Sequence, residues 1–238
     1  MRNQRIQTIV EMALSVALAV VINFMALRLP INIAGGSISL TMLPIVILAL
    51  RRGPWAGSGA GALFGCFDLL MEPFILVPAQ VVLDYPLPYL LLGLGVGMFA
   101  NLYRRALRYR GKAAKSAIDV TKPSDASTEL ASSTVEISNS AARISPQPDT
   151  AAMQTSPTTG SLTKASLLLV FAVVAGGCLR FICHVLSGVL FFAEYAGDQN
   201  VWLYSLVYNV SYLGPSLLAT LLCALLLMPI LEKAVPAN

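Results

Sequence analysis

The sequence contains little charge and only one histidine, and each shortage excludes a class of protein. Of its 238 residues, 12% are charged and 56% are hydrophobic, a balance that ordinary soluble domains do not have. A single histidine, His184, cannot form a multi-histidine metal centre. The sequence also lacks a phosphate-cradling glycine-rich loop and the Gly-x-Ser-x-Gly and His-Glu-x-x-His motifs. We therefore expect no metal, no nucleotide site and no cofactor in this chain.

The cysteines and the net charge also bear on possible metal sites and partners. The four cysteines lie in apolar segments without zinc-type spacing to a histidine: Cys66, Cys178, Cys183 and Cys223. We expect free buried thiols rather than a disulfide or a metal site. The net charge of +4 would suit a nucleic-acid partner, but the basic residues cluster at the ends of apolar blocks. Membrane topology explains that clustering more simply, and we expect no nucleic-acid partner.

Long apolar blocks dominate the chain and predict an all-α integral membrane protein with six transmembrane helices. The blocks cover residues 6–27, 38–50, 55–70, 78–102, 167–192 and 202–231. The second and third are short for isolated spans, so we expect a hairpin packed against its neighbours. The first block is longer than a signal-peptide core and no Ala-x-Ala site follows it, which favours a retained span.

Basic residues predict the orientation of the spans. They precede the first block, separate the second from the third, and flank the other blocks on the same side: Arg2, Arg5, Arg51, Arg52, Arg104, Arg105, Arg108, Arg110, Lys112, Lys115, Lys164 and Lys233. The opposite side carries Arg28 and the acidic residues Glu72, Glu194 and Asp198. Because positive loops stay inside, we expect both termini in the cytoplasm.

The segment 113–163 differs in kind from the rest of the chain. It is rich in Ser, Thr, Ala and Pro and contains no aromatic ring, so it cannot bury enough apolar surface to offset its ordering entropy. We expect a long disordered cytoplasmic linker between the fourth and fifth helices. The membrane domain then consists of 1–112, with four helices, and 164–238, with two.

Small residues recur at helix-packing intervals. The third block carries Gly57, Gly61 and Gly65, the fourth carries Gly93 and Gly97, and the first carries Ala13 and Ala17. Such stripes allow helices to approach closely. For the glycines we favour packing within the bundle. The alanines serve either that packing or the docking of another membrane subunit, and the sequence leaves both open.

Four residues spaced by four, Arg180, His184, Gly188 and Phe192, share one stripe of the fifth helix. Ionisable groups inside a membrane span are costly and usually face a cavity or a partner. The stripe combines a cation, an imidazole, a position without a side chain and an aromatic ring. This pattern predicts one wall of a binding pocket, in which Gly188 leaves room for a flat group.

Two further helices carry polar residues in apolar surroundings. Asp84 lies within the fourth block and needs a cation, a hydrogen-bond network or water. It either pairs structurally with Arg180 or recognises a cationic group of a ligand, and the two states can alternate. The sixth block begins with Tyr204 and contains Asn209, which needs hydrogen-bond partners in a membrane.

These residues, in this order, resemble the thiamine-specific substrate-capture subunits (S components) of energy-coupling factor vitamin transporters. The resemblance is carried by Leu-Arg-Arg-Gly at 50–53, Gln-Val-Val-Leu-Asp-Tyr at 80–85, the stretch from Arg180 to Ala196, and Tyr-Ser-Leu-Val-Tyr-Asn at 204–209. It implies six helices with cytoplasmic termini, a vitamin pocket near the outer face of the bacterial cell membrane, and docking through Ala13 and Ala17. The implied partners are thiamine, a transmembrane coupling subunit and two ATPase subunits that use the ATP.

The resemblance also implies which residues contact the vitamin: Phe74, Asp84, Tyr85, Arg180, His184, Gly188, Phe192, Tyr204 and Asn209. Asp84 stands for a glutamate, Arg180 for a lysine, Phe192 for a stacking tryptophan and Phe74 for a tyrosine, and the loop at 32–36 lacks the tryptophan of the family's pocket lid. Because phenylalanine is a weaker cation–π partner than tryptophan, we expect weaker thiamine binding, or binding of a relative such as its pyrimidine fragment.

Two alternatives belong to other classes. A small intramembrane enzyme would use Asp84 and His184 as an acid–base pair, although a nucleophile or second metal ligand is missing. A self-sufficient transporter would need no ATP-driven module. Thiamine capture remains the favoured hypothesis.

Overall fold

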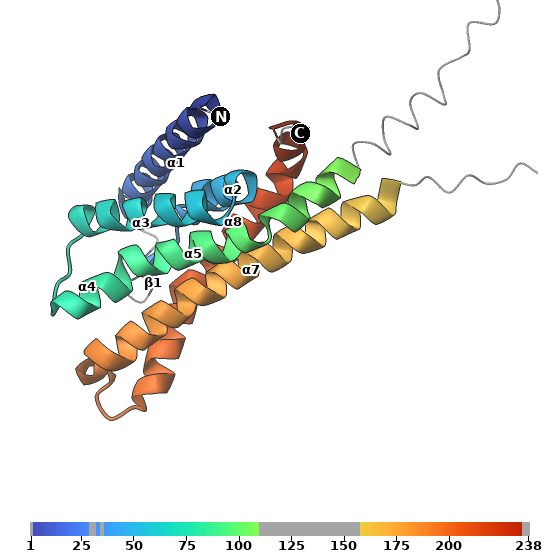
Figure 1. Ribbon diagram of the computed structural model, residues 1–238. Helices are drawn as coiled ribbons and strands as arrows, with labels where there is room; N and C mark the ends of the chain where they lie inside the picture. Colours follow the sequence, from blue (N-terminus) through green and yellow to red (C-terminus); the bar gives the residue numbers. More distant parts are fainter. Residues whose placement is uncertain (1, 29–31, 34–35, 110–157, 235–238) are drawn as a thin grey trace, which may run out of the picture.

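The computed structural model describes residues 2–28, 32–33, 36–109 and 158–234, which fold as a helical bundle (Figure 1). The helices are α1 (Arg2–Arg28), α2 (Met42–Arg52), α3 (Pro54–Met71), α4 (Pro78–Asp84), α5 (Pro86–Met98), α7 (Thr158–Phe191) and α8 (Val201–Ala234). Residues 100–109 are again helical, and the 3-10 turn η1 covers Ala193–Ala196. Strands β1 (Asn32–Ile33) and β2 (Gly36–Ser37) pair antiparallel, a short addition to an otherwise all-α fold.

The predicted membrane fold is confirmed. Four helical stretches of the described chain are long and apolar enough to cross a membrane: Asn3–Met25, Pro78–Tyr109, Lys164–Phe191 and Val201–Leu227. Helix α2 has 11 residues, about 16 Å at 1.5 Å per residue, against a hydrocarbon core of about 30 Å. It packs on α1, α3 and α5 instead, as predicted for a hairpin within the bundle. With α4 and α5 counted together, the described chain has six helices in the bundle, of which α2 is too short to span by itself.

Glycine builds the tight junctions of this bundle. Gly53 joins α2 to α3 with a φ of +95°, which side-chain-bearing residues rarely adopt. Along the contact between α3 and α5, a Cβ atom placed on Gly57 would lie 2.7 Å from the carbonyl oxygen of Gly93. The two backbones therefore touch, and the glycine stripes serve helix packing as predicted.

The fourth apolar block does not form the continuous helix that we expected. It is interrupted at Tyr85, between α4 and α5, because Pro86 has no N–H and its ring obstructs the preceding turn. The regular helix is interrupted a second time at Phe99, and residues 100–109 are helical again. The first interruption places Asp84 and Tyr85 at a helix break instead of within a regular span.

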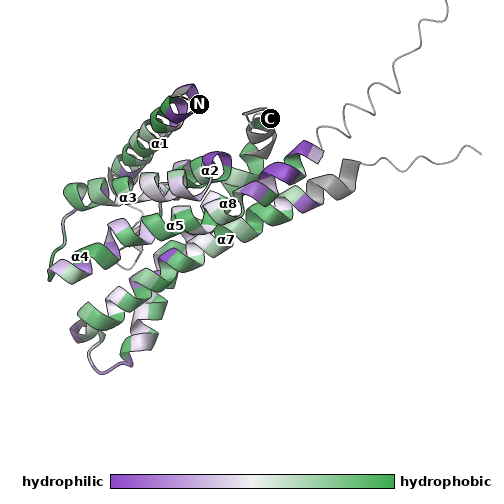
Figure 2. Cartoon of the chain, viewed as in Figure 1, coloured by the Kyte–Doolittle hydropathy of each residue, from purple (hydrophilic) through white to green (hydrophobic). Residues whose placement is uncertain are grey.

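The two ends of the bundle differ. The start of α1, the start of α7 and the end of α8 lie at one end, and α4 and η1 lie at the other (Figure 1). Hydrophilic positions gather at the start of α1 and in the helical segment 100–109, while most of the remaining ribbon is hydrophobic (Figure 2). Exposed apolar side chains cover α1, with Ile9 and Leu14 each 65% exposed. Such a surface suits lipid.

Two predictions from the sequence need correction, one on the end of the linker and one on the burial of the cysteines. Helix α7 begins at Thr158, inside the segment predicted as a linker up to residue 163, because the helix continues beyond the apolar block that marked it. The part 113–157 of that segment lies outside the described residues. The thiols of Cys66 and Cys178 are exposed rather than buried, since a thiol is apolar enough to face a hydrophobic environment.

Candidate functional site

A cavity of about 780 Å³ lies at the end of the bundle formed by α4 and η1, a volume typical of small-molecule sites. Helices α1, α3, α4, α5, α7 and α8 all contribute to its wall. Its described lining comprises Asn23, Ser39, Thr41, Asp68, Glu72, Pro73, Phe74, Asp84, Tyr85, Tyr89, Arg180, His184, Gly188, Phe192, Tyr195, Tyr204, Ser205, Tyr208, Asn209, Tyr212, Leu213 and Ser216.

The structure brings all nine residues that the sequence singled out to this one cavity. They come from the loop after α3, from α4 and the break that follows it, from α7 and the residue just after it, and from α8: Phe74, Asp84, Tyr85, Arg180, His184, Gly188, Phe192, Tyr204 and Asn209. The hypothesis of a binding pocket required that these residues lie around one cavity. Their contact with a ligand stays a prediction.

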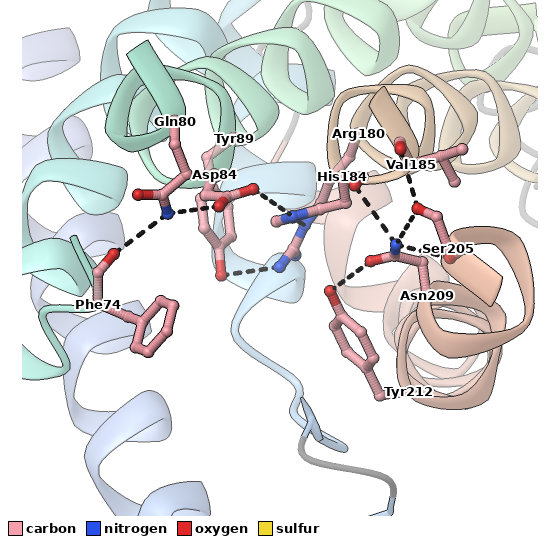
Figure 3. Close-up of polar contacts among 10 residues, drawn as sticks. All are labelled: Phe74, Gln80, Asp84, Tyr89, Arg180, His184, Val185, Ser205, Asn209 and Tyr212. Atoms are coloured by element: carbon pink, nitrogen blue, oxygen red, sulfur yellow. Dashed lines mark hydrogen bonds and ion pairs between the residues drawn. The ribbon is translucent and has the colours of Figure 1, made fainter. Parts of the chain in front are cut away.

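Gln80 holds the Asp84 carboxylate in place. Gln80 is 1% exposed, and its side-chain amide donates to Asp84 Oδ2 at 2.6 Å and to the Phe74 carbonyl at 3.1 Å (Figure 3). Its oxygen accepts the backbone N–H of Leu76 at 3.1 Å. One buried amide thus orients the carboxylate and fixes the loop between α3 and α4.

His184 lies between Asp84 and Arg180. Its Nδ1 is 3.7 Å from Asp84 Oδ1, and its Nε2 accepts the Nε–H of Arg180 at 3.5 Å. An accepting Nε2 carries no proton, so the imidazole is neutral with its proton on Nδ1, directed at the carboxylate. Such a neutral ring is free to stack against a cation.

Arg180 does not form the pair with Asp84 that we considered as the structural alternative. Its Nη2 donates to the Tyr89 hydroxyl at 2.9 Å, and its guanidinium carbon lies 4.0 Å from the centre of the Tyr89 ring. The hydrogen bond and the cation–π contact hold the guanidinium against α5. Asp84 therefore keeps its charge uncompensated by a cation among its described partners.

Tyr85 and Asn209 are largely occupied by the protein itself. The Tyr85 hydroxyl donates to the Glu72 carbonyl at 2.8 Å and accepts the Phe74 N–H at 2.9 Å, so it clamps the loop after α3. The Asn209 amide donates to the carbonyls of Ser205 and His184, and its oxygen accepts the Tyr212 hydroxyl at 2.8 Å. What remains for a ligand is mainly a lone pair on each oxygen.

Gly188 does not leave the room for a flat group that we expected. A Cβ atom there would collide with Ser205, whose own Cβ would be 3.0 Å away. The Ser205 hydroxyl fills the gap and donates to the Val185 carbonyl at 2.9 Å (Figure 3). The glycine is needed because α7 and α8 cross closely at this point.

Aromatic rings form much of the remaining wall. Phe74 and Phe192 are stacked with centroids 5.9 Å apart, and Tyr195 lies 5.8 Å from Phe192. On α8, Tyr204 stacks with Tyr208 at 6.2 Å. Ring faces carry partial negative charge and attract cations and flat heterocycles.

The charged lining adds to this preference for a cation. The described residues of the wall include three carboxylates, Asp68, Glu72 and Asp84, and one guanidinium, Arg180. With His184 neutral, the formal charge of this wall is −2. Low-dielectric surroundings strengthen such an imbalance, and a cationic ligand would reduce it.

Sequence reasoning missed the contribution of α1, α3 and α5 to the site. Asn23, Asp68 and Tyr89 line the cavity from these helices. A signal for Asp68 was present, because it is an acidic residue inside the apolar stretch of α3 and such residues usually serve a site. Asn23 carried a similar signal, an amide inside the first apolar block that needs hydrogen-bond partners, whereas no such signal marked Tyr89.

Ala13 and Ala17 do not line this cavity. Both are exposed on α1, whereas Val16, Ala19 and Asn23 on the opposite side of that helix are buried. The alanines therefore do not pack within the bundle. Their docking of a partner stays a prediction.

The fold and the cavity define a class, the multi-span membrane protein that binds or transports a small molecule. A family model described as "Thiamine transporter protein (Thia_YuaJ)" matches residues 9–236. The chain belongs to this family, which confirms the resemblance and assigns a transport role rather than catalysis.

Individual relatives match nearly the whole chain. It is 28% identical over 231 residues to the "Thiamine transporter ThiT" of Bacillus subtilis, covering 95% of this chain and 91% of that one. It is 24% identical to the protein of the same name from Lacticaseibacillus paracasei, covering 93% and 85%. The solved structure of ThiT from Listeria monocytogenes matches with a TM-score of 0.63 and 27% identity over 98% of this chain and 97% of that one.

Proposed function

We propose that this protein captures thiamine at the outer face of the bacterial cell membrane, as the substrate-binding subunit of an energy-coupling factor transporter. One observation carries the proposal: a cavity rich in aromatic rings has a described wall with a formal charge of −2. Thiamine combines a cationic thiazolium with a flat aminopyrimidine, and both rings suit such a wall. The names of the relatives support the same ligand.

Within this proposal the thiazolium lies against His184 and Phe192, and Asp84 supplies the counter-charge or accepts the aminopyrimidine N–H. The neutral imidazole and the parallel pair of Phe192 and Phe74 support this pose. Tyr204 and the Asn209 oxygen complete the hydrogen bonds. The chain uses no cofactor of its own.

The partners are a transmembrane coupling subunit and two ATPase subunits, which use the ATP. The exposed alanines Ala13 and Ala17 support docking through α1, because small residues permit close helix approach. Both termini lie in the cytoplasm. The basic residues Arg5, Arg51 and Arg104 support this orientation.

Calorimetry with the purified protein tests thiamine capture. Trp55 and Trp202, both within the described residues, lie outside the cavity lining, so tryptophan fluorescence is a poor probe. We expect saturable thiamine binding well below millimolar concentration, and weaker binding of the pyrimidine fragment alone. Binding that is absent below 1 mM (about −4.1 kcal/mol) overturns the proposal, and tighter binding of the fragment replaces thiamine with its precursor.

Uptake into liposomes tests the partnership. We expect accumulation of labelled thiamine only when the coupling subunit, both ATPases and ATP are present. Ala13→Leu with Ala17→Leu should abolish that uptake and leave the calorimetric Kd unchanged, because both positions lie outside the cavity. Uptake by the chain alone identifies a self-sufficient transporter and rejects the ATP-driven module.

A further inference from the structure

Gln80 lies behind the cavity wall rather than in it. It is 1% exposed and is not among the described residues that line the cavity. Its side-chain amide nevertheless binds two residues that do line it, Phe74 and Asp84. A buried amide is costly unless its polar atoms are bonded, so these hydrogen bonds indicate what Gln80 does.

The surroundings of Gln80 allow only one orientation of its amide. Its Nε2 donates to Asp84 Oδ2 at 2.6 Å and to the Phe74 carbonyl at 3.1 Å. Its Oε1 accepts the backbone N–H of Leu76 at 3.1 Å. The reverse orientation would set the amide oxygen against a carboxylate and a carbonyl, and the NH2 group against another donor. Both N–H groups are therefore committed to these two acceptors.

Gln80 thereby joins a charged group to an aromatic ring (Figure 3). Asp84 lies one helical turn further along α4, and Phe74 lies in the loop that precedes this helix. The Tyr85 hydroxyl binds the Phe74 N–H at 2.9 Å, so side chains hold both backbone polar groups of Phe74. The ring of Phe74 in turn stacks on Phe192, with centroids 5.9 Å apart. The carboxylate and this pair of rings are thus held at a fixed separation.

A fixed separation favours a ligand that reaches both groups at once. Two contacts made by one ligand reinforce each other only if the geometry of the two sites matches the ligand. A site that is already ordered also loses less entropy when the ligand binds. A fragment with a single ring reaches one group at a time and gains nothing from their separation. Thiamine, with two linked rings, gains from it.

We propose that Gln80 is a positioning residue that makes the cavity selective for two-ring ligands over their single-ring fragments. It acts from behind the wall, by holding the Asp84 carboxylate and the Phe74 ring in one arrangement. The inference rests on the proposed function, since it concerns how thiamine is recognised in the same cavity. It explains why a residue that lies outside the lining has every polar atom of its side chain bonded to α4 or to the loop before it.

Gln80→Met tests the assignment, because methionine has a similar length but removes all three hydrogen bonds and leaves the charge of the wall unchanged. Calorimetry gives the Kd of thiamine, and displacement of thiamine gives those of the aminopyrimidine and thiazolium fragments. We expect the thiamine Kd to rise at least tenfold and each fragment Kd to change less than threefold. Gln80→Asn keeps an amide that is one methylene too short to reach both acceptors. It should show the same selective loss, and it serves if Gln80→Met does not fold.

Phe74→Leu supplies the decisive background. Without the ring there is no second group to hold at a distance from Asp84, so Gln80→Met should then change the thiamine Kd less than threefold. A Gln80 that only stabilises the fold would instead cause similar losses in both backgrounds. Gln199→Met makes the same exchange at an exposed position outside the cavity and should leave every Kd unchanged.

The outcomes separate this inference from the proposed function. A wild-type protein without saturable thiamine binding, or with tighter binding of a fragment, overturns both. Normal wild-type binding overturns the inference alone if Gln80→Met weakens thiamine and the fragments equally, leaves thiamine binding intact, or has the same effect beside Phe74→Leu. A selective loss that depends on Phe74 supports both.

Discussion

Two groups of ionisable side chains in this helical bundle differ in how their carboxylate is held. In one group the carboxylate pairs with arginines, and in the other its partners are neutral. At the end where α1 starts, Glu11 accepts hydrogen bonds from Arg52 through both carboxylate oxygens, one of them at 2.8 Å from Nε. Arg51 lies 3.5 Å from the same carboxylate. The group joins α1 to the last turn of α2, and both oxygens of its carboxylate are paired with cations.

In the cavity group, by contrast, the Asp84 carboxylate is not paired with a cation among its described partners. Asp84 has an amide and a neutral imidazole as partners, whereas the nearest guanidinium is held on Tyr89. The side chain of Asp84 is 18% exposed and that of Glu11 is 24% exposed, so burial does not distinguish the two carboxylates. The identity of their partners does.

The difference shows how a membrane protein can keep a charge available. A carboxylate paired with arginine stabilises the fold but has no attraction left for a ligand. A carboxylate held by neutral donors is oriented without losing its charge, and it becomes stable when a cation arrives. We therefore expect Glu11 to affect the stability of the protein and Asp84 to affect its affinity for the ligand. The two effects can be measured separately.

Removal of Asp84 should give the largest effect. We expect Asp84→Ala to weaken thiamine binding by about 100-fold, or about 2.7 kcal/mol, because the ligand loses its counter-charge. Calorimetry measures the Kd, and thermal unfolding in detergent should shift little. His184→Ala should cost at least tenfold. Asp84→Asn is the matched control: it keeps the Gln80 contact and loses the charge, so near-wild-type affinity in this variant would show that charge is not what matters.

Removal of Glu11 should have the opposite profile. We expect Glu11→Gln to destabilise the protein by about 1–2 kcal/mol, between the values for exposed and buried pairs, while the thiamine Kd stays within twofold. Thermal unfolding in detergent provides the first value and calorimetry the second. Glu194→Gln, an exposed carboxylate at the other end, should change neither. A weakened Kd in Glu11→Gln would contradict the separation of the two groups.

Sequence was sufficient for the fold because lipid imposes simple rules. Apolar length fixed the spans, and glycine spacing marked the contact between α3 and α5. What it missed were local interruptions, such as the break at Tyr85–Pro86, and the extension of α7 to Thr158. A proline near the start of an apolar block does not by itself reveal whether the span bends or begins there.

For the site, periodicity within one helix was more informative than pairing between helices. The i, i+4 stripe placed Arg180, His184 and Phe192 on one wall correctly. The function of Gly188 was misjudged, because its neighbour Ser205 comes from another helix. Asp68 was overlooked for the same reason: its partner Asn23 lies on α1, and a sequence without structure does not show which helices meet.

A substitution at Phe192 should have the smallest effect of those considered, and it tests whether the charge of the ligand matters in the cavity. Phe192→Trp enlarges the ring face beside the cavity, and tryptophan is the strongest cation–π partner. We expect thiamine affinity to rise by about twofold to threefold, roughly 0.5 kcal/mol, with no gain for an analogue in which a neutral thiophene replaces the thiazolium. Calorimetry with both ligands distinguishes the two cases. Tyr109→Trp, at an exposed position outside the cavity, controls for added bulk and should alter neither affinity. An equal gain for both ligands would mean that contact area, rather than charge, decides binding, and the distinction between the two carboxylate groups would then lose its functional meaning.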